Sequence, residues 1–223
     1  MRDDHVIRPA TVRDVGKATA TLGRAFADYP FTRYTVDGRD HEERVRALQG
    51  LFLTEIGMRC GTVWVSDDVD AVAVWTTPSS TGLDAAFGSV AGRVTELRGD
   101  RALAAELADR ATEGMRPSEP VWFLATVGVD PASQGRGLGR AVLDPGLREA
   151  ERQGFAACLE TSSETNVGFY ESLGFVVTGV VALPDDGPKV WAMRRVQPGR
   201  GASLDSGHAR LPGSRSRGLR TEE

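Results

Sequence analysis

Two stretches in the first quarter of the chain carry apolar residues at helical spacing. The first predicts a helix over 12–27, with Thr11 as its N-cap. Tyr29-Pro30 ends it, because the residue before a proline is pushed away from helical geometry. The second predicts a helix over 41–57. The residues on the two apolar faces are Val12, Val15, Ala18, Leu22 and Phe26, and then Val45, Leu48, Phe52 and Ile56.

Short apolar runs predict strands around these helices. Residues 5–8 indicate a short strand that Pro9 stops. The β-branched and aromatic runs 62–65 and 71–75 predict a hairpin, with the turn supplied by the aspartates between them. The following stretch, 84–113, is rich in Ala, Leu, Arg and Glu, which indicates one or two helices broken near Gly99-Asp100.

The second half of the chain alternates strands and helices. Residues 121–129 form a continuous apolar run typical of a buried strand, and 155–160 read as a second strand, parallel to the first if the crossover between them is right-handed. The remaining expected elements are helices over 137–152 and 166–173 and strands over 175–182 and 189–196. The fold class is therefore α/β.

One pattern conflicts with the helix predicted over 137–152. Pro145-Gly146 falls in its middle. A proline inside a helix removes a hydrogen bond and costs about 3 kcal/mol. We therefore expect the helix to kink or stop there, which leaves its second half in doubt.

Composition narrows the classes of protein that remain. The 223 residues suit one domain, the net charge of −4 gives no electrostatic case for binding nucleic acid, and no apolar run approaches a membrane span. The start lacks the apolar run of a signal peptide, so the expected location is cytoplasmic. Cys60 and Cys158 are expected to be buried free thiols. Residues 197–223 are poor in aliphatic residues and are expected to be a disordered tail after a domain over 1–196; a basic interaction tail is the alternative.

The candidate chemistry begins in a glycine-rich loop between a strand and a helix, Gln134-Gly135-Arg136-Gly137-Leu138-Gly139-Arg140. Glycines let backbone N–H groups converge on a ligand, and a helix start favours an anion such as a pyrophosphate. The spacing is neither the dinucleotide fingerprint nor a P-loop. The alternative is a glycine-rich turn with solvated arginines.

This loop resembles the Q/R-x-x-G-x-G/A signature of the GNAT acetyltransferases. A second segment, Asn166-Val167-Gly168-Phe169-Tyr170-Glu171-Ser172-Leu173-Gly174-Phe175, is similar to the N…(F/L)Y-E-x-L-G-F segment of that family. The resemblance covers residues 5–196. It implies a GNAT fold, in which a mixed sheet of about six to seven strands is flanked by helices and the fourth and fifth strands splay apart.

The resemblance also implies acetyl-CoA as co-substrate, no metal, and direct acetyl transfer to an amine. A backbone N–H near Val129 would hold the thioester oxygen, and Tyr170 would protonate the departing thiolate; the alternative for Tyr170 is a core aromatic. Glu160 is a candidate general base, or else only a hydrogen-bond partner of nearby backbone. The residues implied to bind acetyl-CoA are Val127, Val129, Gln134, Gly135, Arg136, Gly137, Leu138, Gly139, Arg140 and Asn166.

Three further segments bear on the acceptor. Residues 25–30, 71–78 and 122–129 resemble segments of the N-acetyltransferases that inactivate aminonucleoside antibiotics such as puromycin. The resemblance implies resistance by acetylation of a small-molecule amine. Among the aromatic residues, most of which are expected in the core, Tyr29 and Trp75 are the candidate acceptor-pocket walls. The alternatives are another small amine, a protein lysine or N-terminus, and a non-catalytic acyl-CoA-binding module. The segment 80–118 is expected to cover a pocket rather than leave an open groove, and the oligomeric state stays open.

Overall fold

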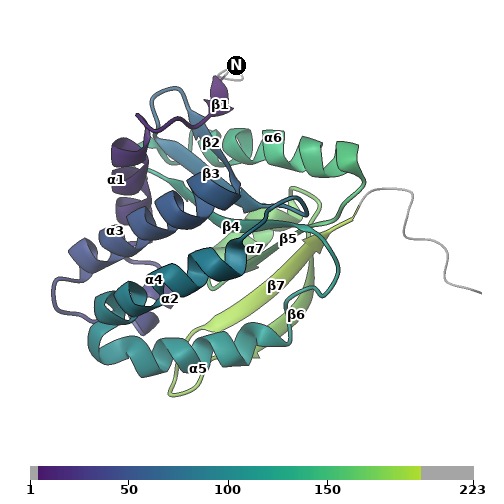
Figure 1. Cartoon of the computed structure of the whole chain (residues 1–223). Coiled ribbons are helices and arrows are strands. Elements are labelled where there is room, and N and C mark those ends of the chain that lie inside the picture. The colour runs from purple at the N-terminus through teal and green to yellow at the C-terminus, as the bar shows by residue number, and fades with distance from the viewer. Residues whose placement is uncertain (1–4, 197–223) are drawn as a thin grey trace, which may run out of the picture.

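A seven-stranded mixed sheet in the order β1-β2-β3-β4-β5-β7-β6 runs through the molecule (Figure 1). The computed structural model describes residues 5–196. The strands are β1 (Ile7–Pro9), β2 (Thr62–Ser66), β3 (Ala71–Thr76), β4 (Trp122–Val129), β5 (Ala157–Thr161), β6 (Val176–Ala182) and β7 (Lys189–Arg195). Adjacent strands pair antiparallel except β4 and β5, which pair parallel. The α/β class, the hairpin and the parallel pair are thus confirmed.

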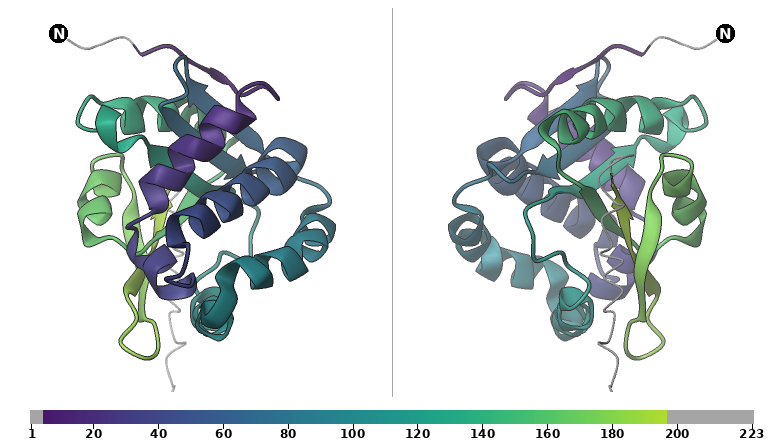
Figure 2. Two further views of the ribbon diagram at one scale, coloured as in Figure 1. Left: turned by 90° about the vertical axis from the view of Figure 1, so that its left-hand side faces the viewer. Right: turned by 90° about the vertical axis from the view of Figure 1, so that its right-hand side faces the viewer.

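Helices cover both faces of this sheet, and Figure 2 shows α6 on one face with α1 and α3 on the other. The alternation of β3 explains the two layers: Ala71, Ala73 and Trp75 pack in the core under α6, whereas Val72 and Val74 pack under α1. The helices are α1 (Val15–Phe26), α2 (Pro30–Thr35), α3 (His41–Phe52), α4 (Leu83–Arg98), α5 (Ala102–Glu113), α6 (Leu138–Gln153) and α7 (Glu164–Glu171). Single turns of other helix types lie at Leu53–Met58 (π) and at Gly99–Arg101 and Pro131–Ser133 (3-10).

Local details at the N-terminal end differ from the predictions. Pro9 belongs to β1 and pairs with Trp64, which is possible because β1 is an edge strand that needs no N–H there. Thr11 is not an N-cap: its backbone N–H and its hydroxyl both donate to the Asp14 carboxylate at 2.8 Å, forming a turn before α1 begins at Val15.

Other outcomes concern the cysteines and the ends of the chain. Cys158 is a buried free thiol as predicted, and burial raises its pKa, whereas Cys60 is only half-buried. Within residues 5–196, no helix has the length and apolar character needed to cross a membrane. The tail expected over 197–223 lies outside the described residues.

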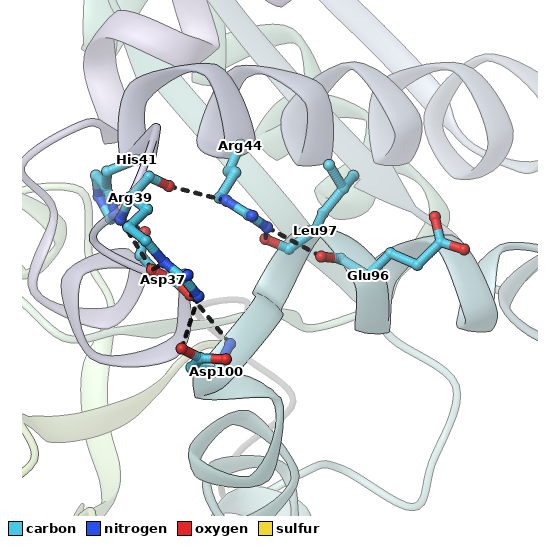
Figure 3. Close-up of polar contacts among 7 residues, drawn as sticks. All are labelled: Asp37, Arg39, His41, Arg44, Glu96, Leu97 and Asp100. Carbon is cyan, nitrogen blue, oxygen red and sulfur yellow. Dashed lines mark hydrogen bonds and ion pairs between the residues drawn. The ribbon is translucent and has the colours of Figure 1, made fainter.

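The segment 80–118 folds as two helices, α4 and α5, and the predicted break at Gly99-Asp100 is confirmed. Figure 3 shows how this junction is held. The buried Asp37 carboxylate accepts from the backbone N–H of Asp100 at 3.2 Å and from the backbone N–H of Arg39 at 2.8 Å. The Arg39 guanidinium then bridges Asp37 and Asp100, at 3.0 and 2.7 Å. These bonds hold the pKa of Asp37 well below its usual range, so the carboxylate stays ionised.

The last turn of α4 is capped from α3. Arg44 donates to the carbonyl oxygens of Glu96 and Leu97, both at 3.0 Å (Figure 3). These carbonyls have no partner within the helix, and a cation there also complements the helix dipole. The loop before α3 adds one more contact, from the Asp37 N–H to the Arg98 carbonyl oxygen at 3.1 Å. The α4–α5 segment is therefore fixed to the rest of the fold at its centre.

Of the two outcomes expected at Pro145, a kink or a stop, the stop is wrong, because α6 continues to Gln153. Its buried stripe extends on both sides of the proline, from Leu138 to Ala150. Tertiary packing of that stripe against the sheet compensates for the missing hydrogen bond. Gly146 is required at this contact, since a Cβ there would lie 2.5 Å from Nε1 of Trp75.

We therefore expect Gly146→Ala to lower the free energy of unfolding by about 1–3 kcal/mol through overpacking. Gly92→Ala is the matched control: it also changes a glycine inside a helix, but its added Cβ meets nothing within 4 Å. Gly92→Ala should instead stabilise the fold, by about 0.5–1 kcal/mol. Urea unfolding of both variants measures the difference, and equal stabilisation by both would contradict the contact with Trp75.

Candidate active site

The site forms where β4 and β5 separate. The two strands pair only over Trp122–Leu124 and Ala157–Leu159, although β4 continues to Val129. The register of β4 against β3 shifts between Leu124 and Thr126, which leaves Ala125 as an unpaired bulge directly after the last pair. A bulge bends its strand. The structure therefore confirms the expected splay and places its cause at Ala125.

A cleft of about 2020 Å³ occupies this opening. One wall comes from β4 and the glycine-rich loop, another from the end of β5 and from α7, and a third from α4 and α5. The segment 80–118, which is expected to cover a pocket, borders the cleft. The predicted site residues that line it are Tyr29, Val127, Val129, Gln134, Gly135, Gly137, Leu138, Gly139, Arg140, Glu160, Asn166 and Tyr170.

The glycine-rich loop reaches α6 through two left-handed glycines. Gly135 has a φ of +76° and Gly137 a φ of +84°, and Gly137 is the N-cap of α6 without a side-chain cap. Within residues 5–196, the N–H groups at the start of α6 have no side-chain capping partner, and they point out of the helix beside the cleft. Such a helix start suits an anionic group, so the residues present fit the pyrophosphate of acetyl-CoA.

Polar residues that the sequence analysis did not identify support the start of this loop. Arg24 of α1 pairs with Asp130, whose other carboxylate oxygen accepts from the N–H of Ala132 at 3.0 Å. The buried Ser133 donates to Asp70 at 2.8 Å. The guanidinium of Arg24 lowers the pKa of Asp130. Arg24 lies more than 100 positions before its partner, so no local pattern could have indicated the pair.

The two arginines of the loop occupy different places. Arg140 donates to the hydroxyl of Ser172 at 2.7 Å, next to the end of α7. Arg136 does not line the cleft, contrary to its predicted place in the site. Its side chain is exposed, and its carbonyl oxygen accepts from Nε2 of His5 at 2.6 Å. The N-terminal segment therefore also supports the loop.

The exposed edge of β4 presents backbone donors to the cleft. The N–H of Asp130 points to β3, where it donates to the Asp70 carbonyl oxygen at 2.8 Å. Successive N–H groups of a strand point to opposite edges. Those of Val129 and Val127 therefore point to the edge that β5 has left, and both residues border the cleft.

Tyr170 lies in the last turn of α7, where it lines the cleft and packs its ring against Phe169 and Phe175. Only 5% of the residue is exposed. Burial raises the pKa of the phenol far above neutrality, with a smaller contribution from Tyr29. Among the described residues the hydroxyl has no hydrogen-bond partner, so it is a protonated group free to interact with a ligand.

Glu160 lies at the end of β5 with its side chain 21% exposed. Its Oε1 is buried and has no hydrogen-bond partner within the described part of the chain, so the carboxylate does not serve nearby backbone through that oxygen. Arg116 approaches it to 3.8 Å. Burial raises the pKa of Glu160, which makes the carboxylate a better proton acceptor than an exposed glutamate.

The two predicted acceptor residues have different surroundings. Tyr29 lines the cleft and joins its walls: its hydroxyl lies 2.9 Å from Oγ1 of Thr161 and accepts from the N–H of Ser162 at 2.7 Å. Trp75 is fully buried between Gly146 and Trp122 and does not border the cleft. The prediction for Trp75 is corrected, because its side of β3 faces α6.

Several known proteins are similar to this chain. The acetyltransferase (GNAT) family model matches residues 88–175. A solved structure from Corynebacterium glutamicum, named histone acetyltransferase HPA2 and related acetyltransferase, is 27% identical with a TM-score of 0.68, covering 87% of this chain and 97% of that one. An uncharacterised N-acetyltransferase of Schizosaccharomyces pombe is 25% identical over 80% of this chain and 77% of its own length.

A further match is local. Mycothiol acetyltransferase of Nocardiopsis dassonvillei is 41% identical over 83 residues, which cover 34% of this chain and only 25% of that protein. This chain therefore corresponds to about a quarter of that relative's length. The family match over residues 88–175, together with the fold shared with known acetyltransferases, supports the assignment of the chain to the GNAT superfamily.

Proposed function

We propose that the protein transfers an acetyl group from acetyl-CoA to the primary amine of a small molecule. One observation carries the proposal: the opening between β4 and β5 gathers the free helix start at Gly137, the β4 donors, Glu160 and Tyr170 around a single cleft. These are the elements that acyl transfer to an amine requires, namely an anion site, an oxyanion donor, a base and an acid.

Acetyl-CoA supplies the activated acetyl thioester. The start of α6 would hold its pyrophosphate, with Gln134, Arg140 and Asn166 at the border of the same cleft. Arg136 would act through its backbone only. The outward N–H of Val129, with that of Val127 beside it, would donate to the thioester oxygen as negative charge develops there.

Two side chains would transfer the protons. Glu160 would take a proton from the substrate ammonium, which frees the nitrogen lone pair for attack on the carbonyl carbon. The carbon–nitrogen bond forms, the carbon–sulfur bond breaks, and Tyr170 would give its proton to the departing sulfur. The second proton that the nitrogen loses would restore the Tyr170 hydroxyl, and the proton taken by Glu160 is the one released. Both residues border the cleft, and Glu160 Oε1 accepts no hydrogen bond from the described residues, which supports these roles. One proton per turnover leaves to solvent.

For the acceptor, the proposal is an aminonucleoside antibiotic such as puromycin, inactivated in the cytoplasm. All three segments that resemble aminonucleoside acetyltransferases supply cleft walls, the first through Phe26 and Tyr29, the second through Thr76 and Thr77, and the third through Phe123. Helices α4 and α5 border the cleft and add apolar walls such as Phe87 and Val90, which suits a small molecule with an aromatic body.

The test is an acetyl-CoA thiol-release assay with puromycin, aminoglycosides, simple arylamines and a lysine peptide. The lysine peptide is included because the Corynebacterium relative carries a histone acetyltransferase name. We expect puromycin to be the best acceptor, modified on its free α-amine. A different preferred small amine would refute only the antibiotic, and a preferred peptide would refute the small-molecule acceptor.

Binding is checked separately from turnover. Acetyl-CoA should raise the melting temperature, since a ligand at a hundred times its Kd stabilises the folded state by about 2.7 kcal/mol. Calorimetric titration that shows no binding of acetyl-CoA or CoA at millimolar concentration would end the proposal.

A further inference from the structure

Four charged side chains of alternating sign line the acceptor side of the cleft. They come from four separate segments: Arg98 from the end of α4, Asp109 from α5, Arg116 from the loop after α5, and Glu160 from β5. The distances are 3.5 Å from Arg98 to Asp109, 3.8 Å from Asp109 to Arg116 and 3.8 Å from Arg116 to Glu160. None of these contacts is close enough for a hydrogen bond, so the charges act on each other across short gaps.

Arg116 is the cation that faces Glu160. On the neighbouring strand β7, the nearest cation, Arg194, is paired with Glu119. From the α1–α2 connection, the Tyr29 hydroxyl is engaged with Thr161 and Ser162 rather than with Glu160. The ionisation of Glu160 therefore depends on burial, which raises its pKa, on Arg116, which lowers it, and on the Asp109 charge, which raises it.

Asp109 competes with Glu160 for the same guanidinium. Arg116 directs Nη2 to Asp109 and Nε to Glu160 at equal distances of 3.8 Å. Asp109 also pairs with Arg98, whose side chain is 16% exposed. The carbonyl oxygen of Arg98 accepts from the N–H of Asp37 at the α4–α5 junction. The fixed junction thus sets where Asp109 lies, and Asp109 in turn limits how closely Arg116 approaches Glu160.

From this geometry we infer that Arg116 is a positioning residue that keeps Glu160 ionised as the base for the acceptor amine. Asp109 opposes this effect, because it competes with Glu160 for Arg116. The inference rests on the acetyl transfer proposed above. An incoming substrate ammonium brings a second cation to the Glu160 carboxylate. Arg116 then retains Asp109 as its partner while Glu160 receives the proton from the ammonium nitrogen. Arg116 itself neither touches the reacting atoms nor transfers a proton.

The experiment follows the Glu160 carboxyl by ¹³C NMR during a pH titration at low ionic strength, with Glu160→Gln to assign the signal. Arg116→Gln removes the neighbouring cation, so the Glu160 midpoint should move to higher pH. Asp109→Asn removes a neighbouring anion and releases Arg116, so the midpoint should move to lower pH. Arg116→Lys keeps the charge and should restore a midpoint near that of the wild type. The control is Arg93→Gln, which breaks an exposed ion pair on α4.

The acidic limb of the kcat/KM profile should follow the same order, with an unchanged KM for acetyl-CoA. If the acidic limb instead reported the ionisation of the substrate amine, it would lie at the same pH in every variant. An active wild type whose Glu160 midpoint does not move in Arg116→Gln, or moves the same way in both variants, overturns the role of Arg116 alone. A wild type that acetylates no amine overturns the proposed function, and Glu160 as base with it, whatever the midpoints.

Discussion

Replacing Tyr170 by phenylalanine should lower kcat by about 10²–10⁴ while the fold and the KM for acetyl-CoA stay close to those of the wild type. The substitution keeps the ring that packs against Phe169 and Phe175 and removes only the hydroxyl. That hydroxyl has no protein partner among the described residues, so no internal hydrogen bond is lost. The departing thiolate would then lack its proton donor. Thiol release at saturating acetyl-CoA measures the effect.

Tyr34→Phe is the matched control. Tyr34 is equally buried and donates to the Pro184 carbonyl oxygen at 2.9 Å, but it does not border the cleft. This variant should lose about 0.5–1.5 kcal/mol of stability and keep its kcat. A fully active Tyr170→Phe would show that solvent or another residue protonates the thiolate, and an inactive Tyr34→Phe would show that stability rather than chemistry limits both variants.

Gly137→Glu should weaken acetyl-CoA binding by about 10² or more, because like charges in contact cost several kcal/mol and each 1.4 kcal/mol is a factor of ten. Gly137 is the N-cap of α6, and the new carboxylate would lie where the pyrophosphate is proposed to bind. The left-handed φ of +84° adds a backbone cost of roughly 1–2 kcal/mol for any other residue. Calorimetry with acetyl-CoA and the acetyl-CoA KM both report the loss.

Two variants separate charge from strain. Gly137→Ala carries the same backbone cost without the carboxylate, so it should bind acetyl-CoA far better than Gly137→Glu. Gly82→Glu places a carboxylate on the left-handed N-cap glycine of α4, where a Cβ meets nothing within 4 Å. It should leave acetyl-CoA affinity unchanged. A folded Gly137→Glu with wild-type affinity would mean that the anion site lies elsewhere.

Much of the fold and the cofactor side of the site could be predicted from the sequence, because the signals are local. The apolar run ending at Val129, the glycines at 135 and 137 and the segment ending in Tyr170-Glu171 each carry their meaning within a few residues. A strand, a left-handed loop and a helix start are decided by neighbouring side chains and by backbone sterics. These local patterns therefore predict where the cofactor side of the cleft lies.

Only the tertiary structure decided which face of the sheet a residue lies on and which distant residues it contacts. Both faces of β3 are buried, so its continuous apolar run could not show that Trp75 faces α6 rather than the cleft. Packing on both sides of Pro145 lets α6 continue to Gln153, whereas the local rule predicts a kink or a stop there. Asp109, Arg116 and Glu160 meet from three separate segments. Such contacts depend on where the chain returns in space, which no local window of sequence contains.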